Sequence, residues 1–328
     1  MTQVFQDIHD GIGNSKIKDC FLVDIDFQNQ SFILKAVKCL LSFINKDFSA
    51  KPWNRSSHFE SFIAPKVNES LSFKDHRFNR IFDCVSALLH HLDDIKDYLE
   101  KNQNVINGIS IIDRGFLDME ILKPIFCATS LMGVHITRPL MHILLDNETT
   151  YTNLGSIFTK LYNDLTVLQA HHFLQTSECV TSFSSSDVFK LTLPKPTILS
   201  SIEACLQEHR NEVRGLLVLF LHSFAKGLST QKGSLFGFGP TANEDTGSLL
   251  KIASASDDVL EKLNTVPVHN LGEERSVGLV NYKMNIYGKR NLDTVSRSVI
   301  LNKSSDLLEN IQKVDRKKWE NQYKTSKK

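Results

Sequence analysis

Residues 197–227 constrain the fold of this chain more than any other segment. Pro194 and Pro196 precede the segment or open it, and proline is favoured in the first turn of a helix. The segment is polar at first and becomes wholly apolar from Leu216 to Phe224. Because a helix that is apolar all round must be buried, we expect this helix at the centre of a core. The apolar run is far shorter than the roughly 20 residues that cross a bilayer, so no membrane span is predicted.

Other segments carry apolar residues at every third or fourth position, which is the spacing of an amphipathic helix. The clearest of them runs from Asp75, a suitable N-cap, to about Glu100. Pro124 should start or kink a later helix. Pro139 should interrupt it, because the residue before a proline avoids the helical region. The predicted helices lie at 31–48, 75–100, 117–135, 140–145, 152–175, 197–227 and 248–263.

Two short stretches favour β-strands instead. Residues 19–28 alternate between apolar and polar side chains and are rich in β-formers, and residues 104–112 contain a second run of branched aliphatic side chains. The sequence therefore predicts strands near 20–28 and 104–112. We expect an α+β protein that is predominantly α-helical, with a core built by its three longest helices.

Glycine, proline and serine mark the breaks between these segments. Residues 177–187 are a polar connection, and the glycines and proline of 229–247 predict a flexible linker and a subdomain boundary. The predicted organisation is a mixed N-terminal segment at 1–112, a helical core at 113–228, the linker at 229–247, a C-terminal segment at 248–302 and a basic tail at 303–328.

The composition limits which cellular compartment and which class of partner we expect. Hydrophobic residues make up 41% of the chain, which excludes a disordered protein. Lys and Arg total 38 against 37 for Asp and Glu, and this net charge of +1 argues against a dedicated nucleic-acid binder while allowing a local basic patch. Six cysteines without a C-x-x-C pair predict buried, reduced thiols. No apolar signal segment follows Met1, so we expect the nucleus or the cytoplasm.

Residues 269–302 contain the most informative polar residues of the chain. Glu274 and Arg275 follow a glycine, Lys289 and Arg290 stand shortly before a leucine, and an apolar helical stretch at 295–301 comes next. This order resembles the C-terminal region of hAT-type transposases, which carries an E-R-x-F-S element, then R-x-x-L, then a helix reading V-x-x-L-x-x-L. The sequence departs from that pattern at residues 277–278, where Val-Gly stands in place of Phe-Ser.

The resemblance implies a ribonuclease-H-like fold interrupted by a large helical insertion, here with a degenerate sheet. Such sites hold two Asp and one Glu, whose hard oxygen ligands bind two Mg²⁺ or Mn²⁺ ions for strand transfer. Glu274 would supply the Glu, and Asp24 or Asp26, on the predicted first strand, would supply one Asp. The simpler interpretation is that both aspartates lie on the solvated face of that strand. No residue matches the second Asp convincingly, and the zinc-finger DNA-binding module usual in the family is missing.

Three hypotheses about function follow. The first is a transposon-derived protein that lacks its DNA-binding module, is catalytically inactive and acts through contacts with protein or nucleic acid. Its partners would be DNA or a second copy of the chain in a homodimer. The candidate nucleic-acid contacts are Arg275, Lys289, Arg290, Lys317 and Lys318. The second hypothesis is a non-enzymatic helical interaction or scaffold protein, for which we expect an exposed apolar groove. The third is an active two-metal nuclease or strand transferase.

The histidines do not predict a metal site. His90–His91 and His171–His172 are adjacent pairs, and neighbouring side chains point in different directions on a helix. Neither an H-E-x-x-H nor a G-x-S-x-G motif occurs, so a zinc protease or a serine hydrolase has no specific support. We expect structural or surface roles for these four residues.

Overall fold

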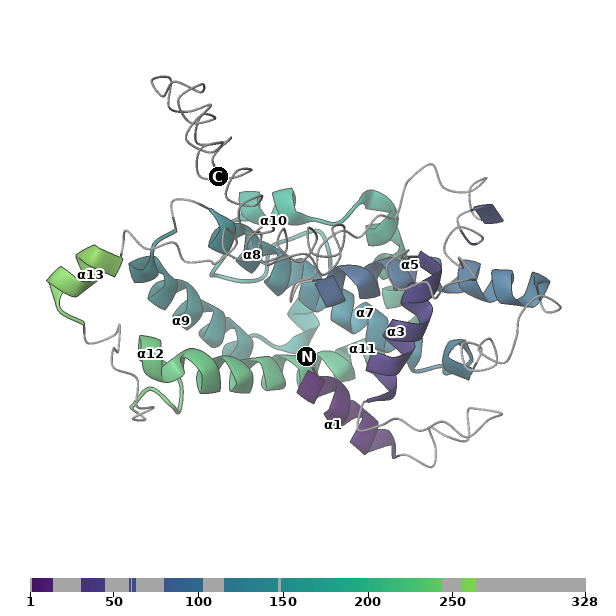
Figure 1. The fold of residues 1–328 in the computed structure, drawn as a ribbon, viewed down its shortest axis with the longest axis horizontal. Coiled ribbons are helices and arrows are strands. Elements are labelled where there is room, and N and C mark those ends of the chain that lie inside the picture. The colour runs from purple at the N-terminus through teal and green to yellow at the C-terminus, as the bar shows by residue number, and fades with distance from the viewer. Residues whose placement is uncertain are drawn as a thin grey trace, which may run out of the picture. The chain divides into compact units, whose positions relative to one another are not determined.

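Helices are the regular structure of this chain wherever the structure describes it (Figure 1). A computed structural model describes residues 2–13, 31–44, 59, 61–62, 80–102, 115–146, 149–243 and 255–263, all within one unit that spans residues 1–268. The elements are α1 Thr2–Ile12, α3 Phe32–Ile44, α5 Arg80–Lys101, α7 Leu122–Met132, the π-helix η2 Gly133–Thr137, α8 Arg138–Leu145, α9 Tyr151–Val167, the 3₁₀-helix η3 Ala170–Phe173, α10 Ser186–Thr192, α11 Pro196–Leu228, the π-helix η4 Ser229–Gly233, α12 Ser234–Phe236 and α13 Asp257–Leu263. In this part of the chain, no helix is long and apolar enough to span a membrane.

The predicted α+β fold is wrong for the residues that the structure describes. They contain no strand and form an all-α protein, so the expected ribonuclease-H-like sheet is not present among them. Both predicted strands, at 20–28 and 104–112, lie outside the described residues. The core forms without a sheet because the apolar faces of the long helices pack directly on one another, which is the alternative way to bury an amphipathic face.

Helix α11 contacts most of the other helices that form this core. It packs against α7, α5, α9 and the 3₁₀-helix η3, and it buries Leu217 and Phe220 completely. The expectation that its apolar part is buried all round is nevertheless wrong. Val218 is 54% exposed and Leu219 is 46% exposed. The neighbouring helices do not cover these two positions, which project in different directions from α11, although their side chains are as apolar as the buried ones.

The N-terminal helix α1 was not predicted from the sequence. Its buried side chains Val4, Phe5 and Ile8 have helical spacing, which is the signal that could have revealed it. The Phe5 ring meets the Phe220 ring edge-on, with 6.1 Å between centroids, so α1 is packed on α11. The buried His9 Nδ1 accepts a hydrogen bond of 3.1 Å from the Phe32 backbone N–H, and this links α1 to the start of α3.

The predicted interruption before Pro139 does not occur. Helix α7 continues through the π-helix η2 into α8, and Arg138, the residue before Pro139, keeps helical angles of φ −69° and ψ −50°. A π-turn shifts the hydrogen-bond register by one residue, which lets the helix continue past a residue that has no N–H. Gly133 opens the π-helix at a close helix crossing, because a Cβ there would lie only 3.1 Å from the Phe82 Cβ of α5.

A buried carboxylate holds the polar connection at 177–187 in place. Asp164, near the end of α9, accepts hydrogen bonds from the Ser182 backbone N–H at 2.7 Å, the Ser182 hydroxyl at 2.8 Å and the Phe183 backbone N–H at 3.3 Å. Asp164 is only 8% exposed. The predicted helix 152–175 is shorter than expected, since α9 ends at Val167 and η3 follows after two extended residues.

Asp164→Asn is expected to lower the free energy of unfolding by about 1–2 kcal/mol, because hydrogen bonds to an ionised acceptor are stronger than those to an amide. Urea titration followed by circular dichroism measures the change. Ser182→Ala is the matched control: it removes only the hydroxyl bond and should cost less than Asp164→Asn. Equal stability of Asp164→Asn and the parent chain would show that the three hydrogen bonds do not hold the connection.

The predicted linker 229–247 begins as helix. The π-helix η4 and α12 continue from α11 as far as Phe236. The chain turns only at Gly237 and Gly239, with φ of 76° and 70°, angles that glycine adopts without strain. A Cβ on Gly239 would also lie 2.5 Å from the Ser229 Oγ, so the turn folds back tightly onto η4.

Candidate functional site

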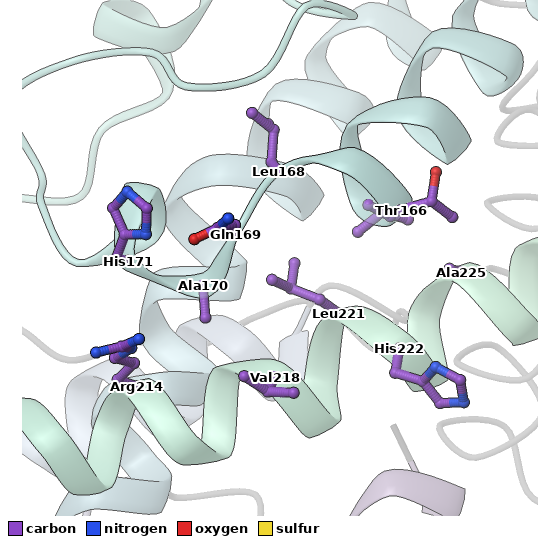
Figure 2. A pocket seen from close by; sticks show the side chains of 11 residues that line it. Thr166, Leu168, Gln169, Ala170, His171, Arg214, Val218, Leu221, His222 and Ala225 are labelled. Atoms are coloured by element: carbon purple, nitrogen blue, oxygen red, sulfur yellow. The ribbon is translucent and has the colours of Figure 1, made fainter.

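Two hollows open on different sides of α11. We call the first the α9 hollow, because α9 and the 3₁₀-helix η3 form its other wall (Figure 2). It has a volume of about 430 Å³. Its lining residues are Leu165, Thr166, Leu168, Gln169, Ala170, His171, Arg214, Val218, Leu221, His222 and Ala225.

The lining of the α9 hollow mixes apolar side chains with polar and basic ones. Figure 2 shows Arg214 and His171 at the same end of the hollow, with Val218 and Leu221 farther along α11. No Asp or Glu occurs among the described residues that line it. Among the described residues, no hydrogen bond or ion pair engages the Arg214 guanidinium. Arg214 is therefore available to a negatively charged group that enters the hollow.

The second hollow, which we call the α5 groove, has a volume of about 1030 Å³. It lies between α5, the segment that leads into α7, and α11. Its apolar lining residues are Leu92, Leu117, Met119, Ile121, Leu122, Pro124, Leu216 and Leu219. The other residues that line it are Asp93, Lys96, Asp118, Glu120, Lys123, His209, Glu212 and Gly215.

The two lysines of the α5 groove are already paired. Lys96 Nζ lies 3.5 Å from Asp118 Oδ1, and Lys123 Nζ lies 3.0 Å from Glu208 Oε2. The hydrogen bond from Lys123 lowers the pKa of Glu208, which is thereby held as a carboxylate. The remaining acids on the lining leave the groove with a negative surplus.

Two thiols meet beneath this groove, where α7 crosses α11. Cys127 Sγ lies 3.7 Å from the Ile202 carbonyl oxygen, and Cys205 Sγ lies 3.7 Å from the Lys123 carbonyl oxygen. A hydrogen bond with Cys205, together with burial, raises the pKa of the Cys127 thiol, so this thiol stays protonated. Cys84, Cys127 and Cys205 are buried and form no disulfide, which confirms the predicted buried, reduced thiols for these three.

The His90–His91 pair forms helix contacts and no catalytic arrangement. His90 Nδ1 lies 2.7 Å from Ser201 Oγ on α11. Ser201 donates its own proton to the Thr197 carbonyl at 3.1 Å, so its hydroxyl accepts from His90 and is not activated as a nucleophile. His91 Nδ1 lies 3.2 Å from Asp94 Oδ2. Within the described ranges, no group of three or more His, Cys, Asp or Glu side chains could hold a metal ion.

His135 of the π-helix η2 is a buried neutral imidazole. Its Nε2 lies 2.6 Å from the Gln175 carbonyl oxygen, and its ring stacks on Phe189 with 5.5 Å between centroids. Burial lowers the pKa of His135 to about 4. The ring thus joins η2 to the chain after η3 and to α10, and it has no access to a ligand in either hollow.

The residues predicted from the sequence to form a site lie outside the described residues. They are Asp24, Asp26, Glu274, Arg275, Lys289, Arg290, Lys317 and Lys318. No protein-family model, curated protein or solved structure matches the chain. Sequence reasoning did not find the two hollows. A sequence signal for the α9 hollow is the pair of polar residues, Arg214 and His222, that interrupts or flanks the apolar run of α11.

Proposed function

We propose that this is a non-enzymatic helical binding protein whose α5 groove takes a basic, amphipathic segment of a partner protein. The observation that carries the proposal is Leu219. This leucine is 46% exposed and projects from a helix whose neighbouring turns are packed in the core. Contiguous apolar patches on a protein surface mark interaction sites, and Leu219 belongs to the apolar lining of the groove together with residues such as Leu92 and Leu216.

The apolar lining of the groove suits one face of a helix. Residues of α5, of the segment 117–124 and of α11 line it, and the apolar side chains among them include Leu92 and Leu216. An amphipathic helix binds such a groove by placing the apolar side chains of one face into it. The volume of about 1030 Å³ accommodates several side chains of that kind.

The charge of the groove suits a basic partner. Its lining carries the four acids Asp93, Asp118, Glu120 and Glu212 against two lysines, each of which is already paired with a carboxylate. Complementary charge speeds the encounter of two proteins and excludes partners of the same sign. A segment with lysine or arginine on its polar face is therefore favoured over an acidic one.

The test uses a synthetic helical peptide with leucines on one face and lysines on the other, and its binding is followed by fluorescence anisotropy. Leu219→Lys should weaken binding at least about tenfold, because it removes the exposed apolar contact and adds a repelling charge. Val218→Lys is the matched control. It makes the same change one residue away, in the α9 hollow, and should alter binding less than about twofold.

Two outcomes would contradict the proposal. One is that Leu219→Lys and Val218→Lys weaken peptide binding equally, which would show that the effect comes from the change in net charge alone. The other is equal binding of a peptide in which glutamates replace the lysines, which would show that the acidic lining does not select the partner.

The origin of the chain stays a prediction. The resemblance of residues 269–302 to hAT-type transposases, the nuclear or cytoplasmic location, and DNA contacts through Arg275 or Lys289 concern residues outside the described ranges. A catalytically inactive transposon-derived protein that acts through protein contacts is compatible with the α5 groove. Mn²⁺-dependent strand cleavage that is lost in Glu274→Gln would support the alternative of an active nuclease.

A further inference from the structure

We propose that the α9 hollow binds a small organic carboxylate with a compact apolar body. This inference is independent of the α5 groove, which lies on another side of α11. It rests on three properties of the hollow: a guanidinium that no described residue pairs with, a lining without acids among the described residues, and apolar side chains from two helices.

Arg214 supplies recognition of the head group. A guanidinium can donate two parallel hydrogen bonds to one carboxylate, and such charge-assisted pairs are among the stronger hydrogen bonds in proteins. Figure 2 shows the Arg214 side chain reaching from α11 toward the chain at Ala170 and His171. Because no described residue of the lining is an acid, none of them competes with a ligand carboxylate for this guanidinium.

The apolar body of the ligand would lie farther along α11. Leu221 and Ala225 from α11, with Leu165 and Leu168 from the end of α9, line this part of the hollow. Val218 lies between the two regions and is 54% exposed, so a bound ligand would cover apolar surface that is now in water. A volume of about 430 Å³ lies in the range of pockets for small organic molecules, roughly 300–1,000 Å³.

The same lining disfavours a polyanion. Nucleic acid and other phosphate chains need several basic side chains along their length. Among the described residues that line the hollow there is one arginine and no lysine, and the other basic side chains there are His171 and His222. A single carboxylate matches this one fixed cation.

The experiment is titration of the full chain with octanoate at pH 7.5, measured by isothermal calorimetry and by saturation-transfer NMR. Arg214→Met should weaken octanoate binding about tenfold, because it removes the guanidinium and keeps an apolar stem of similar length. Arg210→Met is the matched control. It removes the same charge one turn earlier on α11, at a residue that is exposed as Arg214 is but lies outside the hollow, and should leave binding within about twofold.

Two further probes separate the head group from the body. Octanamide, which keeps the chain and lacks the charge, should bind at least about fivefold more weakly than octanoate, and acetate should bind more weakly still. Val218→Asp places a carboxylate in the hollow at an exposed position and should also weaken octanoate binding. No octanoate binding to the parent chain, equal loss in Arg214→Met and Arg210→Met, or equal binding of octanamide would each overturn the proposal.

Discussion

Phe220→Ala is expected to lower the free energy of unfolding by about 3–5 kcal/mol, the range for truncation of a buried aromatic side chain. Phe220 is 0% exposed, and its ring meets Phe5 edge-on at 6.1 Å. Its loss leaves a cavity between α11 and α1 that the surrounding backbone can fill only in part. Chemical denaturation followed by circular dichroism measures the difference, with Phe220→Leu as an intermediate variant in case alanine prevents folding.

Val218→Ala is the control for this prediction. It shortens an apolar side chain on the same helix, two residues away, where 54% of the side-chain surface already faces water. A substitution at such a site changes stability by about 0.5 kcal/mol or less. Similar effects of Phe220→Ala and Val218→Ala would mean that α11 does not present its Phe220 face to the core.

Acid is expected to destabilise the protein by about 3 kcal/mol through His135 alone. Burial lowers the pKa of His135 to about 4 in the folded chain, against 6.5 for an exposed histidine. Between these two pH values the unfolded chain binds a proton that the folded chain does not bind. Each unit by which folding lowers the pKa therefore reduces the free energy of unfolding at acidic pH by about 1.4 kcal/mol. This stability is fully present above pH 6.5 and is lost as the pH falls toward 4.

The measurement is the free energy of unfolding between pH 7.5 and pH 4 for the parent chain and for His135→Gln. Glutamine can still donate a hydrogen bond to the Gln175 carbonyl and does not titrate, so its curve should fall less steeply in this window. Burial also lowers the pKa of His91, and this adds a decrease of the same sign to both proteins. Parallel curves for the two proteins would show that His135 is not responsible.

The long helices were predictable because each repeats its apolar residues over many turns. The helix predicted at 197–227 is confirmed as α11 at Pro196–Leu228, and the helix predicted at 75–100 is confirmed over its described part as α5. Short or interrupted segments were less predictable. Helix α1 spans only three turns, and the residue before Pro139 keeps a helical conformation because a π-turn adjusts the hydrogen bonds around it.

The candidate sites were the least predictable part of the described chain. Arg214 of α11 and His171 both line the α9 hollow, although they are far apart in sequence and share no motif. The contact between His90 and Ser201 likewise spans two helices. Motif searches find functional residues whose spacing along the chain is fixed, and these contacts depend on how helices cross.

The amino-acid sequence by itself determined the long helices, the apolar face of each one, and the buried, reduced state of cysteines such as Cys127. Only the tertiary structure decided that the described residues pack without a sheet, that Val218 and Leu219 stay exposed, and that hollows open on different sides of α11. The physical reason is that the spacing of apolar residues along the chain predicts which face of its own helix each side chain lies on. Whether that side chain is buried depends on the neighbour that packs against it, and that neighbour is specified by the whole set of helices together.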